Sequence, residues 1–220
     1  MAFLVSIRPN QWSKNLVVFA GLLFGEQLFD ESSQFIAIAA FAVFCLGSSS
    51  MYLLNDLLDR LRDQEHPTKS KRPIAAGALS PRAAGIGALT LGTASLSAAF
   101  WLGNSFGFLT LTFLALLSSY SYTLKHIVIL DVLTISLGFV LRASAGAVAI
   151  GVPISSWLLV CTLLLALFLG FTKRRCEMEL LGNMSSRHRK SLIEYTPQLL
   201  DQFIVVTAAA TIVSYAFYTG

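Results

Sequence analysis

Four residues with oxygen-bearing side chains recur at helical spacing in the pattern N-D-x-x-D-x-x-x-D: Asn55, Asp56, Asp59 and Asp63. On an α-helix, positions three, four and seven residues apart lie on one face, so the three aspartates point the same way. Three carboxylates on one face repel one another unless a cation neutralises them. Such oxygen ligands suit Mg²⁺, which proteins typically bind through carboxylates together with substrate phosphates. The pattern therefore predicts Mg²⁺ as a cofactor, bound by these four residues.

The loop after the aspartates carries three bases between two prolines that stiffen it: Lys69, Lys71 and Arg72 between Pro67 and Pro73. A metal bridges phosphate oxygens, and Lys or Arg side chains bind the oxygens that remain. Acidic and then basic residues in this order predict a site for a magnesium diphosphate. The alternative is a solvated helix end whose carboxylates pair with Arg60 and Arg62, although these two arginines fall on other faces of the helix.

A second group of polar residues occupies the stretch "SYSYTLKHIVILDV": Tyr120, Tyr122, Lys125, His126 and Asp131. Asp131 precedes Gly138 by seven residues and Arg142 by eleven, which places the three near one line along a helix. An acid at the mouth, a small residue and a base deeper in the helix suit a polar pocket. His126 fits a general base or a solvated interfacial residue, and the tyrosines fit either a site or an aromatic belt.

Arg142 is the one base inside an apolar stretch of the sequence. Burying an arginine in a membrane is costly unless the side chain is paired or hydrated. Because Arg142 lies near the middle of its stretch, we predict that it lines a polar cavity and does not merely snorkel to the interface. A third polar patch, "RPNQWSKN", contains Arg8, Lys14 and Asn15, and here Lys14 either contacts a phosphate or only marks orientation.

The composition indicates which elements must position these residues. The 220 residues are 55% hydrophobic and only 13% charged, whereas soluble domains carry about 25% charged residues. Several apolar stretches approach the roughly 20 residues that an α-helix needs to cross the hydrocarbon core. We predict an all-α transmembrane bundle, one domain over residues 1–220, with a cytoplasm-facing polar cavity between the second, fourth and fifth spans. The seven expected spans are 16–30, 34–54, 83–102, 106–124, 132–151, 155–172 and 200–219.

The bases are distributed unevenly between the connections. Of the 16 Lys and Arg residues, all except Arg142 lie near the N-terminus or in the connections after the second, fourth and sixth spans. The positive-inside rule then places the N-terminus and the site loops in the cytoplasm of a multi-pass plasma-membrane protein. Because topology accounts for the net charge of +4, no nucleic-acid partner is expected, while self-association into a homo-oligomer stays open.

On these motifs the chain resembles the UbiA superfamily of intramembrane prenyltransferases, along essentially its whole length. Members bind a magnesium-bridged diphosphate with an N-D-x-x-D-x-x-x-D motif after the second span, and a second Asp-bearing motif follows the fourth. Asn55–Asp63 and Tyr122–Asp131 stand in those two places. The family usually has more spans than the seven expected here, so the resemblance implies that C-terminal spans are absent. The second motif is also sparse, since Asp131 is its only acid.

Four stretches resemble the decaprenyl-phosphate phosphoribosyltransferase branch of that superfamily: "RPNQWSKN", "HPTKSKRPIAAG", "YSYTLKHIVILDV" and "GFVLRASAGAVAIGVPIS". Members transfer 5-phosphoribose from phosphoribosyl diphosphate to a polyprenyl phosphate, which supplies lipid-linked sugar precursors for the cell wall. The resemblance implies that Asp59, Asp131 and Lys125 are catalytic. It also implies that Asn55, Asp56, Asp59 and Asp63 bind Mg²⁺ and the diphosphate, and that Lys69, Arg72, Lys125 and Arg142 hold phosphates. Lys14 and Tyr122 complete the predicted substrate-binding residues.

Three other functions share parts of this pattern. Prenylation of an aromatic ring, as in quinone biosynthesis, uses the same acidic helix, and a non-enzymatic membrane component is compatible with a vestigial metal site. A transporter is expected to show paired broken helices at mid-membrane, and the sequence shows no convincing pair. A water-soluble sugar diphosphate needs more cations at the mouth of its site than an aromatic acceptor does. The bases near the aspartates and in the second polar group therefore favour phosphoribosyl transfer.

Overall fold

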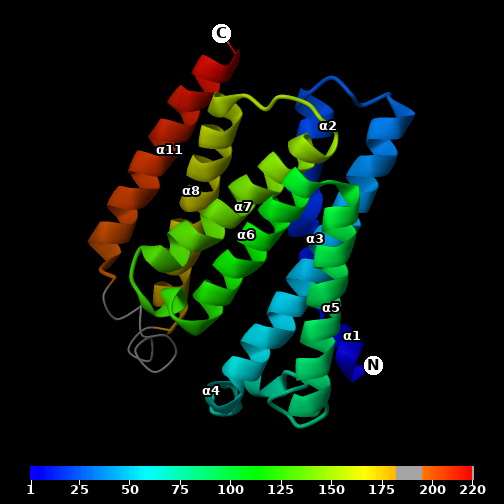
Figure 1. The fold of residues 1–220 in the computed structure, drawn as a ribbon. Coiled ribbons are helices and arrows are strands. Elements are labelled where there is room, and N and C mark those ends of the chain that lie inside the picture. Colours follow the sequence, from blue (N-terminus) through cyan, green and yellow to red (C-terminus); the bar gives the residue numbers. More distant parts are fainter. Residues whose placement is uncertain (182–194, 220) are drawn as a thin grey trace. The chain divides into compact units, whose positions relative to one another are not determined.

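The computed structural model describes the backbone of residues 1–181 and 195–219 and the side chains of residues 1–179 and 195–219. All regular secondary structure in these residues is helical, as the sequence predicts (Figure 1). The long helices are α3 (Glu31–Leu58), α5 (Pro81–Leu102), α6 (Asn104–Tyr122), α7 (Leu130–Ala149), α8 (Ser156–Leu181) and α11 (Pro197–Thr219). The short segments are α1 (Ala2–Ser6), η1 (Pro9–Phe19), α2 (Ala20–Phe24), α4 (Arg60–Gln64), η2 (Lys69–Lys71) and η3 (Leu124–His126).

Six helices in the described part of the chain are long and apolar enough to cross a membrane, and they are the six long ones. They correspond to the second through seventh expected spans. The prediction of a first span at 16–30 is wrong, because these residues lie in η1, in the five-residue α2 and in the turn before α3. A helix of five residues rises about 7.5 Å, far short of the roughly 30 Å hydrocarbon core. Gly21 instead packs tightly on protein, since a Cβ there would lie 2.6 Å from the Cα of Ala147.

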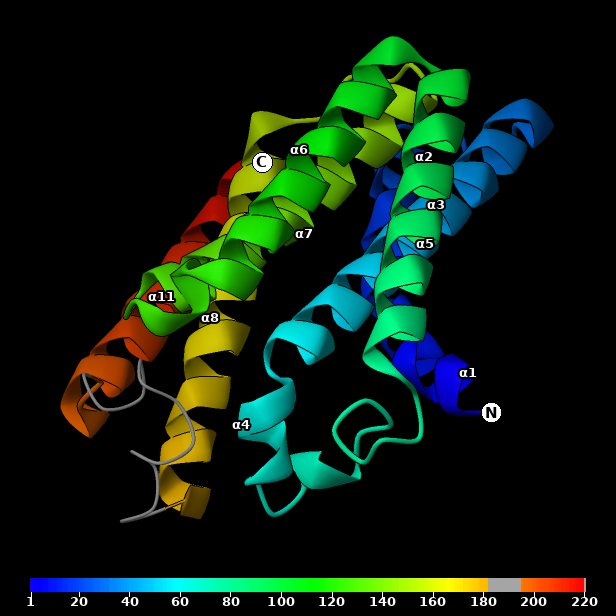
Figure 2. The ribbon, with the colours of Figure 1, turned by 60° about the horizontal axis from the view of Figure 1, so that its bottom comes forward.

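The chain forms two compact units, and one of the boundaries between them falls within α7. Unit 1 comprises residues 1–121 and 141–153, and unit 2 comprises the described residues of 122–140 and 154–220. Within unit 1, α3 and α5 lie side by side in opposite directions (Figures 1 and 2). Within unit 2, α8 and α11 lie side by side.

Small residues and serines bring α3 and α5 together. The Ser50 hydroxyl donates to the Ala88 carbonyl at 2.6 Å. The Ser95 hydroxyl donates to the Val43 carbonyl at 2.9 Å, and a Cβ on Gly47 would lie 2.9 Å from Ser95 Oγ. In lipid, where apolar burial does not drive helices together, close packing of small residues and interhelical hydrogen bonds do so. This interface fixes α3, whose last turn begins the acidic motif.

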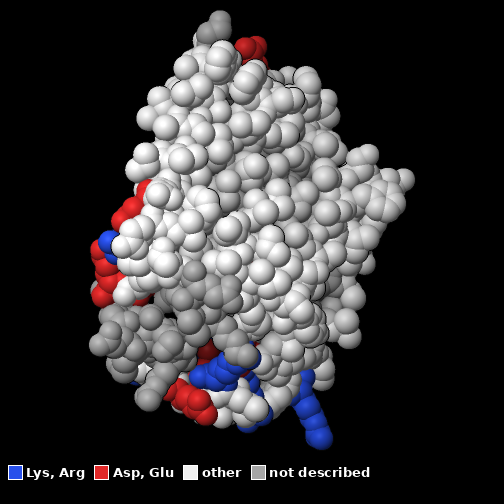
Figure 3. All heavy atoms as spheres, turned by 90° about the vertical axis from the view of Figure 1, so that its left-hand side faces the viewer, with Lys and Arg blue, Asp and Glu red and all other residues white. Residues whose placement is uncertain are grey.

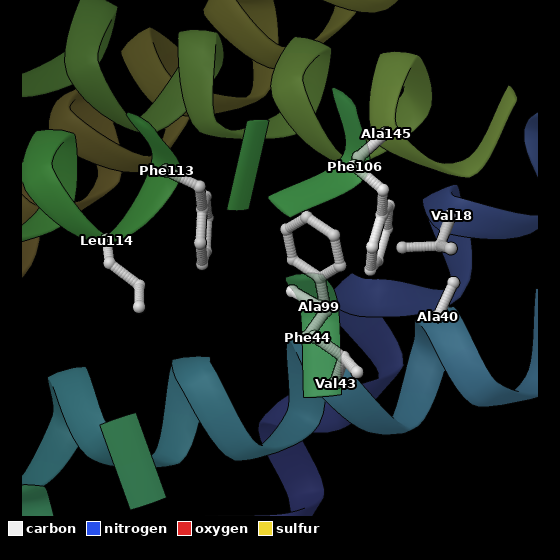
Figure 4. Packing of buried hydrophobic residues seen from close by; sticks show 9 residues of the cluster. All are labelled: Val18, Ala40, Val43, Phe44, Ala99, Phe106, Phe113, Leu114 and Ala145. Carbon is white, nitrogen blue, oxygen red and sulfur yellow. The ribbon is translucent and has the colours of Figure 1, made fainter. Parts of the chain in front are cut away.

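The core of unit 1 contains residues from η1, α3, α5, α6 and the end of α7 (Figure 4). The ring of Phe44 is fully buried and meets Phe106 and Phe113 in T-shaped arrangements, with centroids 6.0 and 5.0 Å apart. Aromatic pairs in this geometry add about 0.5–1.5 kcal/mol to the free energy of burial. The remaining members of the cluster are Val18, Ala40, Val43, Ala99, Leu114 and Ala145.

The core of unit 2 lies where α7 and α8 meet the start of α11, and its buried members are Val132, Phe171, Tyr195 and Leu200. Phe171 stacks on Phe203 with ring centroids 4.7 Å apart. Gly170 allows α8 to approach α7, because a Cβ there would lie 2.4 Å from Val132 Cγ1. This packing places the first turn of α7 against α8.

Large apolar side chains remain exposed on helices of both units, among them Phe35, Leu89, Trp101, Val205 and Ile212. In the face shown in Figure 3, Lys, Arg, Asp and Glu lie at the bottom, along the left edge and in a small acidic patch at the top, and most of the surface carries none. Apolar surface on this scale marks contact with a membrane or a partner. Together with the six apolar helices, it indicates a multi-pass membrane protein.

Candidate active site

The acidic motif spans the junction between α3 and α4. Asn55 and Asp56 lie in the last turn of α3, Asp59 caps that helix, and Asp63 belongs to α4. The Asp59 N–H donates to the Asn55 carbonyl at 2.9 Å. The Asp63 N–H donates to the Asp59 carbonyl at 2.8 Å. Helical spacing therefore persists through the junction, which is why Asp56 and Asp63 reach a common partner.

That common partner is Arg72. It belongs to the loop of residues 65–80 between α4 and α5, which we call the basic loop. Arg72 Nη1 donates to Asp56 Oδ1 at 3.0 Å and to Asp63 Oδ2 at 2.7 Å. Asp56 is 2% exposed and Asp63 is 4% exposed. Two carboxylate oxygens thus converge on one cationic atom in a buried setting, where charge-assisted hydrogen bonds are short and strong.

A second arginine, Arg8, binds Asp56 from the N-terminal segment. Its Nη2 donates to both carboxylate oxygens, at 2.6 and 2.8 Å. The guanidinium also lies 5.1 Å from the centroid of the Tyr52 ring. The backbone at Arg8 is left-handed, with φ 52°, a conformation that is uncommon outside glycine and typical of turns and functional sites. The sequence places Arg8 in a polar patch but does not link it to Asp56, because 48 residues separate the two and no local pattern connects them.

A few side-chain contacts hold the basic loop against the helices of unit 1. Ile74 is 1% exposed and packs in a cluster with Leu53 of α3. The Gln64 side chain donates to the Ala75 carbonyl at 3.1 Å, which ties the loop to α4. These anchors hold the segment around Arg72 beside the aspartates. Lys69, on the same loop, is half-buried.

The donor set of the acidic motif fits a hard cation. Among residues 1–181 and 195–219, no three His, Cys, Asp or Glu side chains lie close enough to share one metal ion in the arrangement seen. Asp56 and Asp63 nevertheless present oxygen donors that converge on a single cation, here Arg72, and oxygen is the ligand that Mg²⁺ prefers. Burial raises the pKa of Asp63, and the charge of Arg72 only partly offsets this. Further positive charge near the pair is therefore favourable.

Arg142 lies buried in a polar cluster of unit 1. Its Nε donates to Asn15 Oδ1 at 2.7 Å, and its Nη2 donates to Ser48 Oγ at 3.5 Å. The guanidinium lies 4.5 Å from the centroid of the Phe113 ring. These three partners are uncharged, and Asn15 is fully buried. Lys14, the neighbour of Asn15 in sequence, is exposed.

Three of the predicted site residues lie in unit 2. Tyr122 is exposed at the end of α6, Lys125 is buried in η3, and Asp131 is fully buried in the first turn of α7. Arg174 Nε donates to Asp131 Oδ2 at 2.9 Å, and the Tyr195 hydroxyl donates to Asp131 Oδ1 at 2.7 Å. No sequence pattern pointed to Arg174 or Tyr195, which are 43 and 64 residues from Asp131.

Comparison with known proteins connects these groups to one family. Residues 15–179 match the model of the UbiA prenyltransferase family, a range that includes the acidic motif, the basic loop and all of α7. A UbiA homolog from Archaeoglobus fulgidus, solved bound to GPP and Mg²⁺, has the same fold with a TM-score of 0.85. It is 21% identical in sequence, and the match covers 99% of this chain and 77% of that one.

Two curated relatives are more similar in sequence. The chain is 37% identical over 218 residues to a Decaprenyl-phosphate phosphoribosyltransferase of Mycolicibacterium smegmatis, which covers 97% of this chain and 68% of that protein. It is 37% identical over 217 residues to the protein of the same name in Corynebacterium glutamicum, which covers 97% of this chain and 65% of that protein. The chain thus spans about two thirds of the length of these relatives. It belongs to the UbiA prenyltransferase family.

Proposed function

We propose that this chain transfers 5-phosphoribose from phosphoribosyl diphosphate to a polyprenyl phosphate and releases pyrophosphate. The observation that carries the proposal is the 37% identity, over 97% of the chain, to two proteins named as decaprenyl-phosphate phosphoribosyltransferases. The bases beside the acidic motif support it, because a charged and water-soluble donor needs them more than an aromatic acceptor does. The product is a lipid-linked sugar phosphate that serves as a cell-wall precursor.

The reaction breaks one bond and forms one. An ionised oxygen of the lipid phosphate attacks C1 of the ribose, and the bond from C1 to the diphosphate oxygen breaks. The leaving pyrophosphate takes the electron pair, while positive charge develops on the ribose ring. Because the lipid phosphate is already ionised at neutral pH, the step needs no strong general base. The site mainly has to stabilise the charge of the departing diphosphate.

Mg²⁺ is the proposed cofactor, and when bound it would neutralise charge on the diphosphate oxygens. Asn55, Asp56, Asp59 and Asp63 are the residues proposed to hold it. The convergence of Asp56 and Asp63 on one guanidinium nitrogen supports this assignment. Asp59 is proposed as the catalytic member of the motif.

Proposed phosphate-binding residues come from both units of the chain. In unit 1, Lys69 and Arg72 follow the acidic motif, Lys14 flanks Asn15, and Arg142 lies buried beside Asn15. In unit 2, Lys125 is buried in η3 and Tyr122 is exposed at the end of α6. A catalytic role for Lys125, as a cation that contacts the reacting phosphates, is part of the same proposal.

The proposed location is the plasma membrane, with the N-terminus and the basic loops in the cytoplasm and one transmembrane domain over the chain. The clustering of bases after α3, α6 and α8 supports this orientation. A cysteine placed at His66, in a background in which the three native cysteines are replaced, should react with a membrane-impermeant thiol reagent only in inverted vesicles. Reaction from the outside of intact cells would reject the orientation.

Two parallel assays test the function. The purified chain and Mg²⁺ receive ribose-labelled phosphoribosyl diphosphate with a polyprenyl phosphate in one tube, and a prenyl diphosphate with labelled 4-hydroxybenzoate in the other. We expect label in the lipid phase of the first tube only. Product in the second tube alone would replace phosphoribosyl transfer with aromatic prenylation, and product in neither would favour a non-enzymatic component.

A further inference from the structure

The carboxylate of Asp131 is buried and hydrogen-bonded inside unit 2. Asp131 is 0% exposed, and each of its oxygens accepts a hydrogen bond from a different element. Arg174, near the end of α8, donates to Oδ2 at 2.9 Å, and Tyr195, just before α11, donates to Oδ1 at 2.7 Å. Arg174 is itself buried and also pairs with Glu177 at 2.6 Å. These two hydrogen bonds fix the orientation of the carboxylate inside unit 2.

Tyr195 also fixes the backbone that leads into α7. Its hydroxyl oxygen accepts a hydrogen bond from the Ile129 N–H at 2.7 Å. Ile129 has a φ of 67°, a left-handed conformation that is strained for a β-branched residue and persists only where the surroundings impose it. Burial and the neighbouring Asp131 raise the pKa of Tyr195, so its hydroxyl stays protonated and remains a donor.

The strained peptide adjoins the segment that carries the candidate catalytic cation. Lys125 and His126 form the end of η3, three residues before Ile129. The Leu130 N–H donates to the Val128 carbonyl at 2.8 Å, which makes this connection a tight turn. The path of residues 127–130 therefore sets where η3 lies relative to the first turn of α7.

From this geometry we infer that Asp131 is a positioning residue, and that Arg174, Asp131 and Tyr195 form a brace that holds the η3 segment with Lys125 in place. The brace joins α7, α8 and the residue before α11 through two hydrogen bonds to one carboxylate. The brace gives the single acid of the second motif a positioning role. The functional consequence rests on the proposed role of Lys125, whereas the brace itself does not.

Hydrogen–deuterium exchange and kinetics of the full chain test the brace together. The variants are Tyr195→Phe, Asp131→Asn and their combination, and the control is Tyr215→Phe, which alters an exposed tyrosine of α11. We expect amides around Ile129 to exchange about threefold to tenfold faster in Tyr195→Phe, as loss of one hydrogen bond implies, and to stay unchanged in the control. We expect kcat to fall in both single variants, with an unchanged Mg²⁺ requirement and a double variant no worse than the poorer single one.

Two results would overturn the inference. One is unchanged exchange around Ile129 in Tyr195→Phe. The other is an Asp131→Asn variant that needs more Mg²⁺ while Tyr195→Phe behaves like the native chain, because this pattern identifies Asp131 as a metal ligand. The exchange measurement needs no substrate, so it decides on the brace even if the native chain shows no phosphoribosyl transfer. If Asp131→Asn does not fold, the conservative Tyr195→Phe still supplies the deciding exchange data.

Discussion

At the scale of single residues, arginine side chains orient two carboxylates of the acidic motif. Asp56 receives Arg8 and Arg72, and Asp63 receives Arg72. Both arginine side chains are about three-quarters covered, with 27% and 25% exposed. Pairs that are this buried fix the direction of a carboxylate, and removal of one partner leaves the other charge poorly solvated. Arg8 thereby controls the orientation of a proposed metal ligand from a distant part of the chain.

Replacing Arg8 by lysine tests that control. The Arg8→Lys variant keeps the charge but loses the planar group that reaches both oxygens of Asp56 and lies over Tyr52. We expect kcat/KM for phosphoribosyl transfer to fall roughly tenfold to a hundredfold, as loss of a hydrogen bond to a charged group implies. We also expect the Mg²⁺ requirement to rise. Steady-state kinetics at several Mg²⁺ concentrations measure both quantities.

The matched control for Arg8 is Arg82→Lys, an exposed arginine at the start of α5. It should leave the kinetics unchanged. Native kinetics in Arg8→Lys, or an equal loss in both variants, would contradict a specific role for Arg8.

Asp59 is the residue proposed to combine metal binding with catalysis. Asp59→Asn should lower phosphoribosyl transfer about a hundredfold or more, because loss of a metal ligand costs more than the roughly tenfold to hundredfold loss seen when a residue that only orients a ligand is changed. The midpoint of thermal unfolding in detergent should stay close to native, since Asp59 caps α3 through backbone hydrogen bonds. Glu65→Gln, at an exposed acid just after α4, is the control. Near-native turnover in Asp59→Asn would remove the assigned role.

Arg142 is proposed to bind an anionic group from within a span. Arg142→Leu should raise the KM for one substrate, while the midpoint of thermal unfolding stays close to native. Arg142→Lys should recover part of the lost affinity. The hydrogen bonds to Asn15 and Ser48 hold the guanidinium in a buried polar cluster, from which it can contact an anionic group. A variant that fails to insert or fold, with no rescue by lysine, would show that Arg142 is structural.

At the scale of elements, the sequence predicted the long helices well and the N-terminal segment poorly. Length and apolar character suffice to identify a spanning helix, and six of the seven expected spans are confirmed. Residues 16–30 are also largely apolar, yet they form the end of a 3₁₀ segment followed by one short helix. Gly21 of that short helix packs against Ala147. Hydropathy does not report whether an apolar stretch forms one continuous helix, which is why this prediction failed.

The candidate site shows the same division between local and distant information. The helical spacing of Asp56 and Asp63 was readable, and both residues do reach one arginine. The partners that are distant in the chain could not be predicted from the sequence: Arg8 is 48 residues from Asp56, and Asn15 is 127 residues from Arg142. Periodicity reports on one element at a time, whereas these pairs depend on how loops and helices pack.

Gly146 tests how tightly η1 is seated on α7 within unit 1. A Cβ at this position would lie 1.8 Å from the carbonyl oxygen of Val18, a backbone atom that cannot turn aside. Gly146→Ala should therefore lower the free energy of unfolding by about 1–3 kcal/mol, the usual cost of overpacking. Gly85→Ala is the control, because the nearest atom to its Cβ would be Leu57 Cδ2 at 4.0 Å. Equal midpoints of thermal unfolding in the two variants would contradict this close contact.

At the scale of the whole molecule, the chain combines two chemically different surroundings. Its six long helices carry an apolar exterior suited to lipid. Its charged residues cover only a small part of the face shown in Figure 3. A lipid phosphate presents its chain to hydrocarbon and its charge to water, so an enzyme that joins it to a soluble sugar diphosphate needs both surroundings. Membership of the UbiA prenyltransferase family is consistent with this arrangement.

The most direct measurement follows both halves of the donor at once. The purified chain, Mg²⁺ and a polyprenyl phosphate are incubated with phosphoribosyl diphosphate labelled with ¹⁴C in the ribose and ³²P in the terminal phosphate. We expect one ¹⁴C-ribose in the lipid phase for each ³²P-pyrophosphate released, with both events strongly reduced in Asp59→Asn and absent without the lipid. Pyrophosphate release without ribose in the lipid, or lipid labelling that Asp59→Asn retains in full, would contradict the proposed reaction.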